Sequence, residues 1–393
     1  MSTWQIHKSL AIKIYLPSFL MSICQGSVIL AIPLYALDLG SDTGVAAFVF
    51  AMRGLGNMAV DVPAGYATSR WGDRTVMLLG VGLMALCAWV SVNIESALQL
   101  SLAAFVFGAA MAMWLLARLS HIRDAIPHSH RGRAISTMAG LQRFGNVLGP
   151  VCTGIVADQF GFDAVFGFVF VLAIIAWLVV VSGVKTNRKT QNENPPGILR
   201  LLPFILSKHR TIFMTAGSAV FILTLLRAGR QLLIPLWGEH IGISTTDIGI
   251  IVSLASAVDM MLFPVAGHLM DNYGRKYSAV SCLAIMSFGV ILVPFTASFS
   301  SLLVVAAIAG AGNGMGSGIN MTLGADFAPT SEQGEFLGVW RLLSDTGSFT
   351  GPLAIGYISN VMYLSSAFYL TGLLGIIGVL VMFITVRETL EKS

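Results

Sequence analysis

The sequence GNVLGPVCTG at residues 145–154 decides the fold, because the chain repeats its pattern as GSFTGPLAIG at residues 347–356. The two stretches are 202 residues apart, and the same offset relates IPL at residues 32–34 to IPL at residues 234–236. The ranges that share this register without a gap are 32–154 and 234–356. The chain is therefore an internal duplication, and each half is expected to fold in the same way.

The composition places both halves in a membrane. Hydrophobic residues make up 55% of the chain and charged residues 11%, and the mean hydropathy is +0.80. Soluble domains carry roughly a quarter charged residues. Apolar runs of about 20 residues, enough to cross a bilayer as a helix, recur along the chain. We predict an all-α integral membrane protein with two bundles of six helices, at residues 14–37, 44–66, 75–93, 99–121, 137–158, 163–184, 211–238, 246–267, 278–296, 301–325, 338–360 and 364–386.

The placement of Lys and Arg predicts the orientation of these helices. The loops after helices 1, 3, 5, 7, 9 and 11 contain no Lys or Arg, whereas the opposite loops contain residues such as Arg70, Arg74, Arg275 and Lys276. By the positive-inside rule both termini are cytoplasmic. The net charge of +4 is thus a topology signal, and no nucleic-acid partner is expected. Compact loops and short tails favour a multi-pass protein of the bacterial inner membrane.

Three segments follow from this pattern. We predict an N-terminal bundle at 1–184, a cytoplasmic linker at 185–210 with a short amphipathic helix around 198–206, and a C-terminal bundle at 211–393. The four cysteines lie inside apolar helices without CxxC or metal-ligand spacing, and the histidines show no such spacing either. We expect no metal, no cofactor and no enzymatic activity. The chain also has no GxxxxGK[ST] phosphate loop, so a gradient must supply the energy.

Two stretches after helices 2 and 8 carry a family resemblance. They are GYATSRWGDR at residues 65–74 and GHLMDNYGRK at residues 267–276. With the duplicated six-helix halves, they resemble the GxxxDxxGR(K/R) signature of the major facilitator superfamily. The first copy departs from it, because Ser69 stands in place of the acid and Asp73 in place of a cation. The resemblance implies gating residues at Gly65, Gly72, Arg74, Gly267, Asp271, Gly274 and Arg275.

The opening stretch resembles the antiporter motif of the drug:proton exporters in this superfamily. Its elements are Gly145, Gly149 and Pro150, and Gly351 and Pro352 repeat them in helix 11. The glycines let helices approach and the proline bends its helix. The resemblance favours export. The alternative is general helix packing by small residues, and the copy of the pattern in helix 11 makes it a less specific marker of export.

The helix-4 arginine of those exporters is absent from this chain. It would fall near Ala104, whereas Arg118 lies more than three turns closer to the cytoplasm. The proton mechanism of the drug exporters is therefore not carried over to this protein.

Charged residues inside the apolar spans are the sharpest functional signal, since each costs several kcal/mol unless it is paired or hydrated. The cations are Arg53, Arg118, Arg143, Arg227 and Arg230, and the acids are Asp61, Asp259 and Asp345. Five cations against three acids leave two positive charges in excess. Guanidinium groups bind carboxylate or phosphate in a bidentate manner. We expect the arginines and Gln25, the repeat counterpart of Arg227, to bind an anionic or zwitterionic substrate. The alternative is a structural ion network in which Asp259 or Asp345 neutralises arginines of other helices.

Proton coupling needs a carboxylate whose pKa crosses the working pH as its surroundings alternate. Asp259 and Asp345 are the leading candidates, followed by Asp61. Asp259 lies about 12 Å before the glycine that ends its helix, and Arg53 about 18 Å, so neither reaches cytoplasmic water easily. A substrate anion that competes for an arginine would release the acid to take up a proton.

Together these observations predict a proton-coupled exporter that works by alternating access as a monomer. Its expected partners are protons, the lipid bilayer and a small amphipathic, anionic compound such as a drug, a metabolite or a carboxylate siderophore. Two alternatives stay open. One is a proton-coupled uptake symporter for an organic anion, and the other is a non-transporting membrane receptor or scaffold.

Overall fold

The computed structural model describes residues 11–125, 128–184 and 198–390, and long helices dominate this part of the chain. Contacts divide the chain into two compact units. Unit 1 comprises Met1–Asn192 with Ser244–Ser253, and unit 2 comprises Glu193–Ile243 with Leu254–Ser393. Each unit is described by itself.

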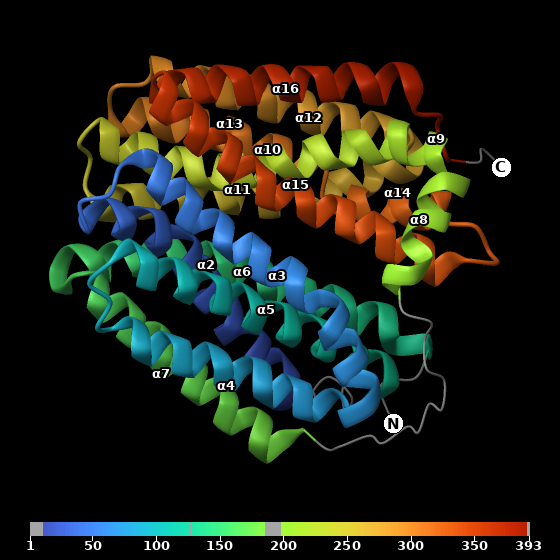
Figure 1. The fold of residues 1–393 in the computed structure, drawn as a ribbon, viewed down its shortest axis with the longest axis horizontal. Coiled ribbons are helices and arrows are strands. Elements are labelled where there is room, and N and C mark those ends of the chain that lie inside the picture. The colour runs from blue at the N-terminus through green and yellow to red at the C-terminus, as the bar shows by residue number, and fades with distance from the viewer. Residues whose placement is uncertain (1–10, 126–127, 185–197, 391–393) are drawn as a thin grey trace. The chain divides into compact units, whose positions relative to one another are not determined.

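Unit 1 contains a π-helical turn and then six long helices. The turn is Ala11–Tyr15, and the helices are α2 (Leu16–Asp38), α3 (Thr43–Trp71), α4 (Asp73–Ser91), α5 (Ala97–Ala125), α6 (His128–Phe160) and α7 (Phe162–Gly183). The helix α3 packs along α5, α2 packs along α6, and α4 packs against both α5 and α7 (Figure 1).

Unit 2 repeats this order after two short helices. Its α-helices are α8 (Ile198–Lys208), α9 (Arg210–Ile212), α10 (Ser218–His240), α11 (Thr245–Asn272), α12 (Arg275–Leu292), α13 (Phe299–Met315), α14 (Ile319–Phe327), α15 (Gln333–Val361) and α16 (Leu364–Thr385). A π-helical turn, Phe213–Gly217, precedes α10, and a 3-10 turn, Val293–Phe295, follows α12. The first residues of α11, Thr245–Ser253, belong to unit 1 by their contacts. The helix α10 packs along α15, and α12 packs along α13 and α16 (Figure 1).

The predicted fold class is confirmed. Within the described residues, ten helical segments are long and apolar enough to cross a membrane. The two other long helices, α6 and α15, hold the GxxxGP stretches together with Arg143 and Asp345. The amphipathic helix expected around 198–206 is also observed, as α8, whereas residues 185–197 of the linker lie outside the described residues.

One predicted helix is interrupted. Residues 301–325 were expected to form a single helix, but α13 ends at Met315 and α14 begins at Ile319. The intervening Gly318 has a left-handed backbone conformation, with φ of +84°, which glycine adopts without a steric cost. Gly314 and Gly316 add to the break because each glycine lowers helix propensity by about 1 kcal/mol relative to alanine.

The GxxxGP glycines bring helices into backbone contact. A Cβ atom at Gly149 would lie 2.7 Å from the carbonyl oxygen of Ile23, so α6 touches α2 without an intervening side chain. In unit 2 a Cβ atom at Gly347 would lie 2.5 Å from the carbonyl oxygen of Phe221, which joins α15 to α10 in the same way. Both halves thus use the motif to pack their first long helix against their fifth.

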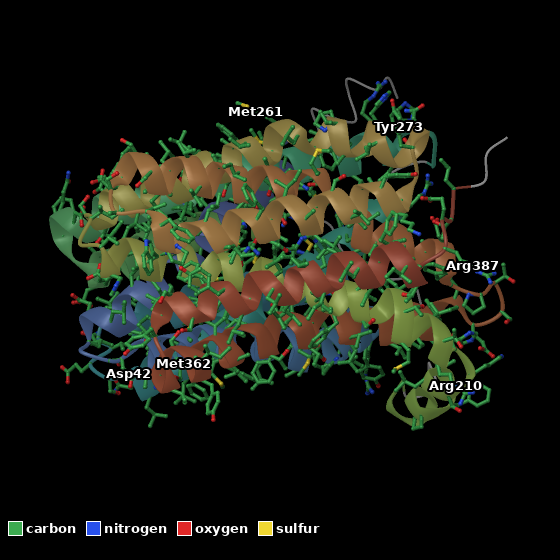
Figure 2. All side chains as sticks on the ribbon, turned by 90° about the horizontal axis from the view of Figure 1, so that it is seen from above. Asp42, Arg210, Met261, Tyr273, Met362 and Arg387 are labelled. Carbon is green, nitrogen blue, oxygen red and sulfur yellow. The ribbon has the colours of Figure 1, made fainter. Side chains whose placement is uncertain are left out.

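Two basic residues that flank the long helices of unit 2 lie at the same end of it. Arg210 and Arg387 lie with Tyr273 at that end, and Met362 lies at the other (Figure 2). The end of helix α8 is bound to Glu332, whose carboxylate accepts hydrogen bonds from Lys208 Nζ at 2.5 Å and His209 Nε2 at 3.3 Å. These two bonds, that of Lys208 first, hold the pKa of Glu332 below its ordinary value of 4.5.

Candidate functional site

In unit 1 the site begins with Arg53, near the middle of α3. Its backbone carbonyl would collide with any Cβ atom at Gly108 of α5, so the two helices fix the depth of this arginine. The guanidinium carbon lies 4.9 Å from the centre of the Phe50 ring. Among the described residues no carboxylate is within ion-pair distance of Arg53, and its Nε is buried without an acceptor.

Other polar side chains of unit 1 share this lack of partners within the described structure. Gln25 Oε1, Asn57 Oδ1 and Asn146 Oδ1 are buried, and none of these oxygens accepts a hydrogen bond. Gly26, beside Gln25, would place a Cβ atom 3.3 Å from the Asn146 backbone, so these two amides come from touching segments of α2 and α6. A buried unsatisfied polar group costs about 1–3 kcal/mol. Such groups in one bundle indicate hydrogen-bonding capacity held for something other than the protein.

In unit 2 the polar residues form a network around the helix break. Asn313 Nδ2 donates to Asp259 Oδ2 at 2.6 Å, and Ser317 Oγ donates to Asp259 Oδ1 at 3.5 Å. Arg227 Nη2 donates to the carbonyl oxygen of Gly316 at 2.8 Å. Asp259 and Arg227 therefore both hold the break between α13 and α14.

Arg230 lies one turn after Arg227 on α10, and its side chain is buried. The hydrogen bonds at the helix break therefore bring Arg227, one member of the predicted basic pair, together with Asp259, a predicted proton carrier. For Arg227 this arrangement is the one that a structural network would produce, since its guanidinium stabilises a helix terminus.

The remaining predicted charges are distributed over both units. Arg143 lies on α6 and Asp61 on α3 in unit 1, whereas Asp345 lies on α15 in unit 2. Asp345 Oδ2 is 3.7 Å from the Nε of Arg341, one turn earlier in the same helix. The pair is partly exposed and therefore contributes little stability.

The two copies of the gate signature differ in structure as well as in sequence. In the first copy Gly72 ends α3 with φ of +83°, and Arg74 Nη2 donates to the Val181 carbonyl at 2.8 Å. In the second copy Arg275 Nη1 lies 3.9 Å from Asp271. No described atom of its own unit approaches within 4 Å of a Cβ atom built at the signature's first glycine, Gly65 or Gly267.

Glu388 completes the second gate signature, and sequence reasoning missed it. Its carboxylate accepts hydrogen bonds from the backbone N–H groups of Arg275 at 2.9 Å and Lys276 at 3.1 Å, at the start of α12. The carboxylate fills the space that a side chain at Gly274 would need, and Gly274 has φ of +117°. A negative charge at a helix N-terminus is favourable. The only sequence signal was an acid after the last helix.

Asp73 and His121 form a second feature that the sequence did not reveal as a pair. His121 Nδ1 lies 2.8 Å from Asp73 Oδ2, and only 9% and 5% of the two side chains are exposed. The acid that replaces a cation in the first signature therefore pairs within unit 1, with α5. Its departure from the signature was the available signal.

Comparison with known proteins places this architecture in a family. A sequence model of the Major Facilitator Superfamily matches residues 14–229 and 217–393. The chain belongs to this superfamily. It is a membrane transporter of the major facilitator kind, and the resemblance noted from the gate signatures is confirmed.

Relatives of this superfamily member come from archaea and bacteria. The chain is 20% identical over 382 residues to the uncharacterized MFS-type transporter MJ1560 of Methanocaldococcus jannaschii, with 95% of this chain and 97% of that protein covered. It is 27% identical over 335 residues to the MFS-type transporter YuxJ of Bacillus subtilis, covering 80% and 82%. It is also 24% identical over 162 residues to the quinolone resistance protein NorA of Staphylococcus aureus, covering 41% of each chain.

Solved structures share the fold at low sequence identity. The nucleoside transporter NupG superposes with a TM-score of 0.80 at 13% identity, over 96% of this chain and all of that one. A POT family transporter in complex with a thioalcohol-conjugated peptide superposes with a TM-score of 0.78 at 12% identity, over 96% of each chain.

Proposed function

We propose that this transporter exports small amphipathic anions from the bacterial cytoplasm in exchange for protons, by alternating access. The observation that carries the proposal is Arg53, a guanidinium group near the middle of a predicted membrane span with no carboxylate partner among the described residues. Such a charge costs several kcal/mol in a membrane. A substrate carboxylate that forms a bidentate pair with Arg53 would offset this cost.

The substrate class follows from the contrast between the two units. In unit 2 the carboxylate of Asp259 and the guanidinium of Arg227 contact adjacent residues at the helix break, whereas no described carboxylate lies within ion-pair distance of Arg53 in unit 1. A lipophilic cation would add to the excess positive charge, and an anion would reduce it. The unsatisfied oxygens of Gln25 and Asn57 favour a ligand that also carries hydrogen-bond donors. Anionic drugs, metabolites and carboxylate siderophores all meet these requirements.

Asp259 is the proposed proton carrier. It accepts hydrogen bonds from Asn313 and Ser317 beside the helix break that Arg227 also contacts. An anion bound by the arginines of α10 would neutralise their charge, so that the carboxylate could take up a proton. Proton uptake and anion binding would then be linked through these arginines.

The proposed direction rests on a relative and on the GxxxGP motif. NorA is named as a quinolone resistance protein, and export is the direction in which a transporter confers resistance. The competing function is uptake of an organic anion together with protons. The two differ in the direction of anion movement for one imposed pH gradient.

Two measurements test the proposal in sequence. Thermal stability of the purified protein would be measured with a panel of organic anions, zwitterions and lipophilic cations, for wild type and Arg53→Met. We expect stabilisation by anions in the wild type alone. Everted vesicles with an acidic interior should then accumulate the stabilising anion. Stabilisation by lipophilic cations in both proteins would refute the anion assignment, and anion accumulation only under the reversed gradient would establish uptake.

A further inference from the structure

A second arginine without a carboxylate partner among the described residues lies on α5, nearer the end that is predicted to be cytoplasmic. Arg118 is only 3% exposed, and its Nη2 donates to Gln142 Oε1 of α6 at 2.9 Å. Its Nε and Nη1 are buried and have no acceptor in the described part of the chain. Gly108 marks the level of Arg53 on α5, and Arg118 follows it by ten residues, which is about 15 Å along a helix. Arg118 therefore does not belong to the Arg53 subsite.

Trp114 adds a third unused donor beside this arginine. It lies one turn before Arg118, and the centre of its ring is 5.8 Å from the guanidinium carbon. The side chain is fully buried, and its indole Nε1 has no acceptor among the described residues. Three donor nitrogens, two of them on a cation, therefore lack an acceptor among the described residues within two turns of α5. Donors without acceptors call for an anion, because water would leave the charge uncompensated.

The acid that contacts α5 pairs with another residue. Asp73 at the start of α4 lies 2.8 Å from the Nδ1 of His121, which follows Arg118 by one turn on α5. No ion pair to Arg118 is present in the described structure, and the only side chain that binds it, Gln142, is neutral.

The internal repeat provides a control for this arrangement. The residues 202 positions after Arg118 and Gln142 are Asn320 and Ser344, and Asn320 Nδ2 donates to Ser344 Oγ at 2.8 Å. Asn320 Oδ1 also accepts a hydrogen bond from Trp340 Nε1 at 2.8 Å. The same helix contact therefore exists in unit 2 with neutral groups that satisfy one another. Packing of these helices does not require a charge, so the guanidinium in unit 1 needs another explanation.

We propose that Arg118 and Trp114 form a second anion-binding site in unit 1, for a carboxylate or phosphate group. Gln142 is its positioning residue, because it fixes one guanidinium nitrogen and leaves the other two for the ligand. The site lies toward the end of α5 that the positive-inside rule predicts to be cytoplasmic. The proposal that an exported anion binds here first rests on the proposed function. The proposal that the site binds an anion is independent of it.

Trp114 makes the site observable. Tryptophan fluorescence of the purified full-length protein would be titrated with butyrate and with inorganic phosphate at constant ionic strength, using choline chloride as the reference salt. The chain has seven tryptophans, so the difference between wild type and Trp114→Phe isolates the signal of this indole. We expect a saturable Trp114-dependent change with at least one of the two anions. A change that does not saturate, or that Trp114→Phe retains in full, would overturn the proposal.

The matched variant carries the unit 2 residues. Arg118→Asn combined with Gln142→Ser installs the neutral pair that unit 2 already uses, and we expect it to weaken anion binding at least tenfold. Its thermal stability should equal or exceed that of the wild type, because a buried charge without a counterion is removed. A variant that is markedly less stable, or that binds as well as the wild type, would show that Arg118 is structural. Arg118→Lys keeps the charge but removes the planar guanidinium group, so it should bind the anion more weakly than wild type. This variant provides a second test if the double variant does not fold.

Two further arms identify the anion and separate the proposals. Nanodiscs of phosphatidylglycerol and of phosphatidylcholine distinguish a lipid phosphate from a soluble anion. If the butyrate concentration at half-maximal fluorescence change is higher in phosphatidylglycerol than in phosphatidylcholine, the site binds the lipid headgroup. If this concentration is the same in both lipids, the site binds a soluble anion. Both outcomes support the site. Arg53→Met should abolish transport and keep the Trp114 signal. If the signal persists but no anion is transported, the site stands and the proposed function fails.

Discussion

Gly149→Ala should loosen the contact between α2 and α6 and destabilise unit 1. The added Cβ atom would lie 2.7 Å from the Ile23 carbonyl oxygen and 2.8 Å from both the Cα of Gly26 and the backbone nitrogen of Ser27. All three are backbone atoms, so no side chain can rotate out of the way. Ordinary contacts of a Cβ atom begin at 3.4 Å. The two helices must therefore separate by roughly 0.6 Å, because protein interiors are close-packed and transmit such shifts.

The cost of this separation can be worked out from its parts. Inserting a methyl group into a packed interface typically costs about 1–3 kcal/mol. The hydrogen bond from Ser27 Oγ to the Gly149 carbonyl, now 3.2 Å long, would lengthen beyond the useful range and lose about 1 kcal/mol more. Alanine regains up to about 1 kcal/mol of helix propensity. The net loss is about 1–3 kcal/mol.

Equilibrium unfolding in SDS, followed by circular dichroism, measures this loss. The matched control is Gly167→Ala in α7, where no neighbouring atom of the described residues lies within 4 Å of the new Cβ atom. The control should be as stable as the wild type or slightly more stable. If Gly149→Ala unfolds at the same SDS fraction as Gly167→Ala, the backbone contact between α2 and α6 does not constrain the bundle, and the reasoning fails.

Substitutions at three other positions test contacts in unit 2. Because hydrogen bonds from Lys208 and His209 lower the pKa of Glu332, its contribution is present above the unfolded-state pKa and is lost as the pH falls through the folded-state value. Hydrogen exchange of α8 at pH 7 should therefore be faster in Glu332→Gln than in wild type, and the difference should disappear as the pH is lowered through the folded-state pKa of Glu332. Glu388→Gln should increase exchange at the start of α12, and unchanged exchange there would count against the cap. Asp259→Asn should fold as wild type, because the Asn313 amide can turn its unpaired Oδ1 toward the new donor, and its transport should no longer respond to a pH gradient. Asp259→Ala instead leaves the Asn313 donor without an acceptor and should lower the free energy of unfolding by about 1–3 kcal/mol.

The fold was accessible from the sequence because two independent periodicities agreed. Hydrophobic spans of bilayer length predicted long helices, and the offset of 202 residues predicted that each would occur twice. The GxxxGP glycines also indicated where helices touch, since a glycine that recurs every fourth or fifth residue leaves one face of a helix bare. The contacts of Gly149 and Gly347 follow this pattern.

The helix break was not accessible in the same way. Alternate glycines at residues 310–318 predict close packing, and Gly310, Gly312 and Gly314 do pack against neighbouring backbones. Nothing in the spacing distinguishes those three from Gly318, which adopts a left-handed conformation instead. The difference arises because Arg227 and Asp259, both distant in sequence, hold the residues around the break.

The buried charges were identified from the sequence, but their pairing was not. Depth along a helix follows from residue number, whereas the partner of a side chain depends on the rotation of several helices at once. Asp73 thus pairs with His121, and the described hydrogen-bond acceptor of Arg118 is the neutral Gln142. The sequence predicts anion binding by the arginines of unit 1, whereas the structure shows which of them lack a carboxylate partner among the described residues.

The contact of Glu388 has a practical consequence for anyone who produces this protein. An affinity tag fused after Ser393 begins six residues beyond Glu388, whose carboxylate caps α12. Thr389, the residue after Glu388, is held as well, by a hydrogen bond of 2.6 Å to Asp326. A polyhistidine or other charged tag at that end would place new charges beside this cap and disturb the loop that the gate signature forms. Expression vectors for functional work should therefore carry the tag at the N-terminus, or behind a long neutral spacer with a cleavage site.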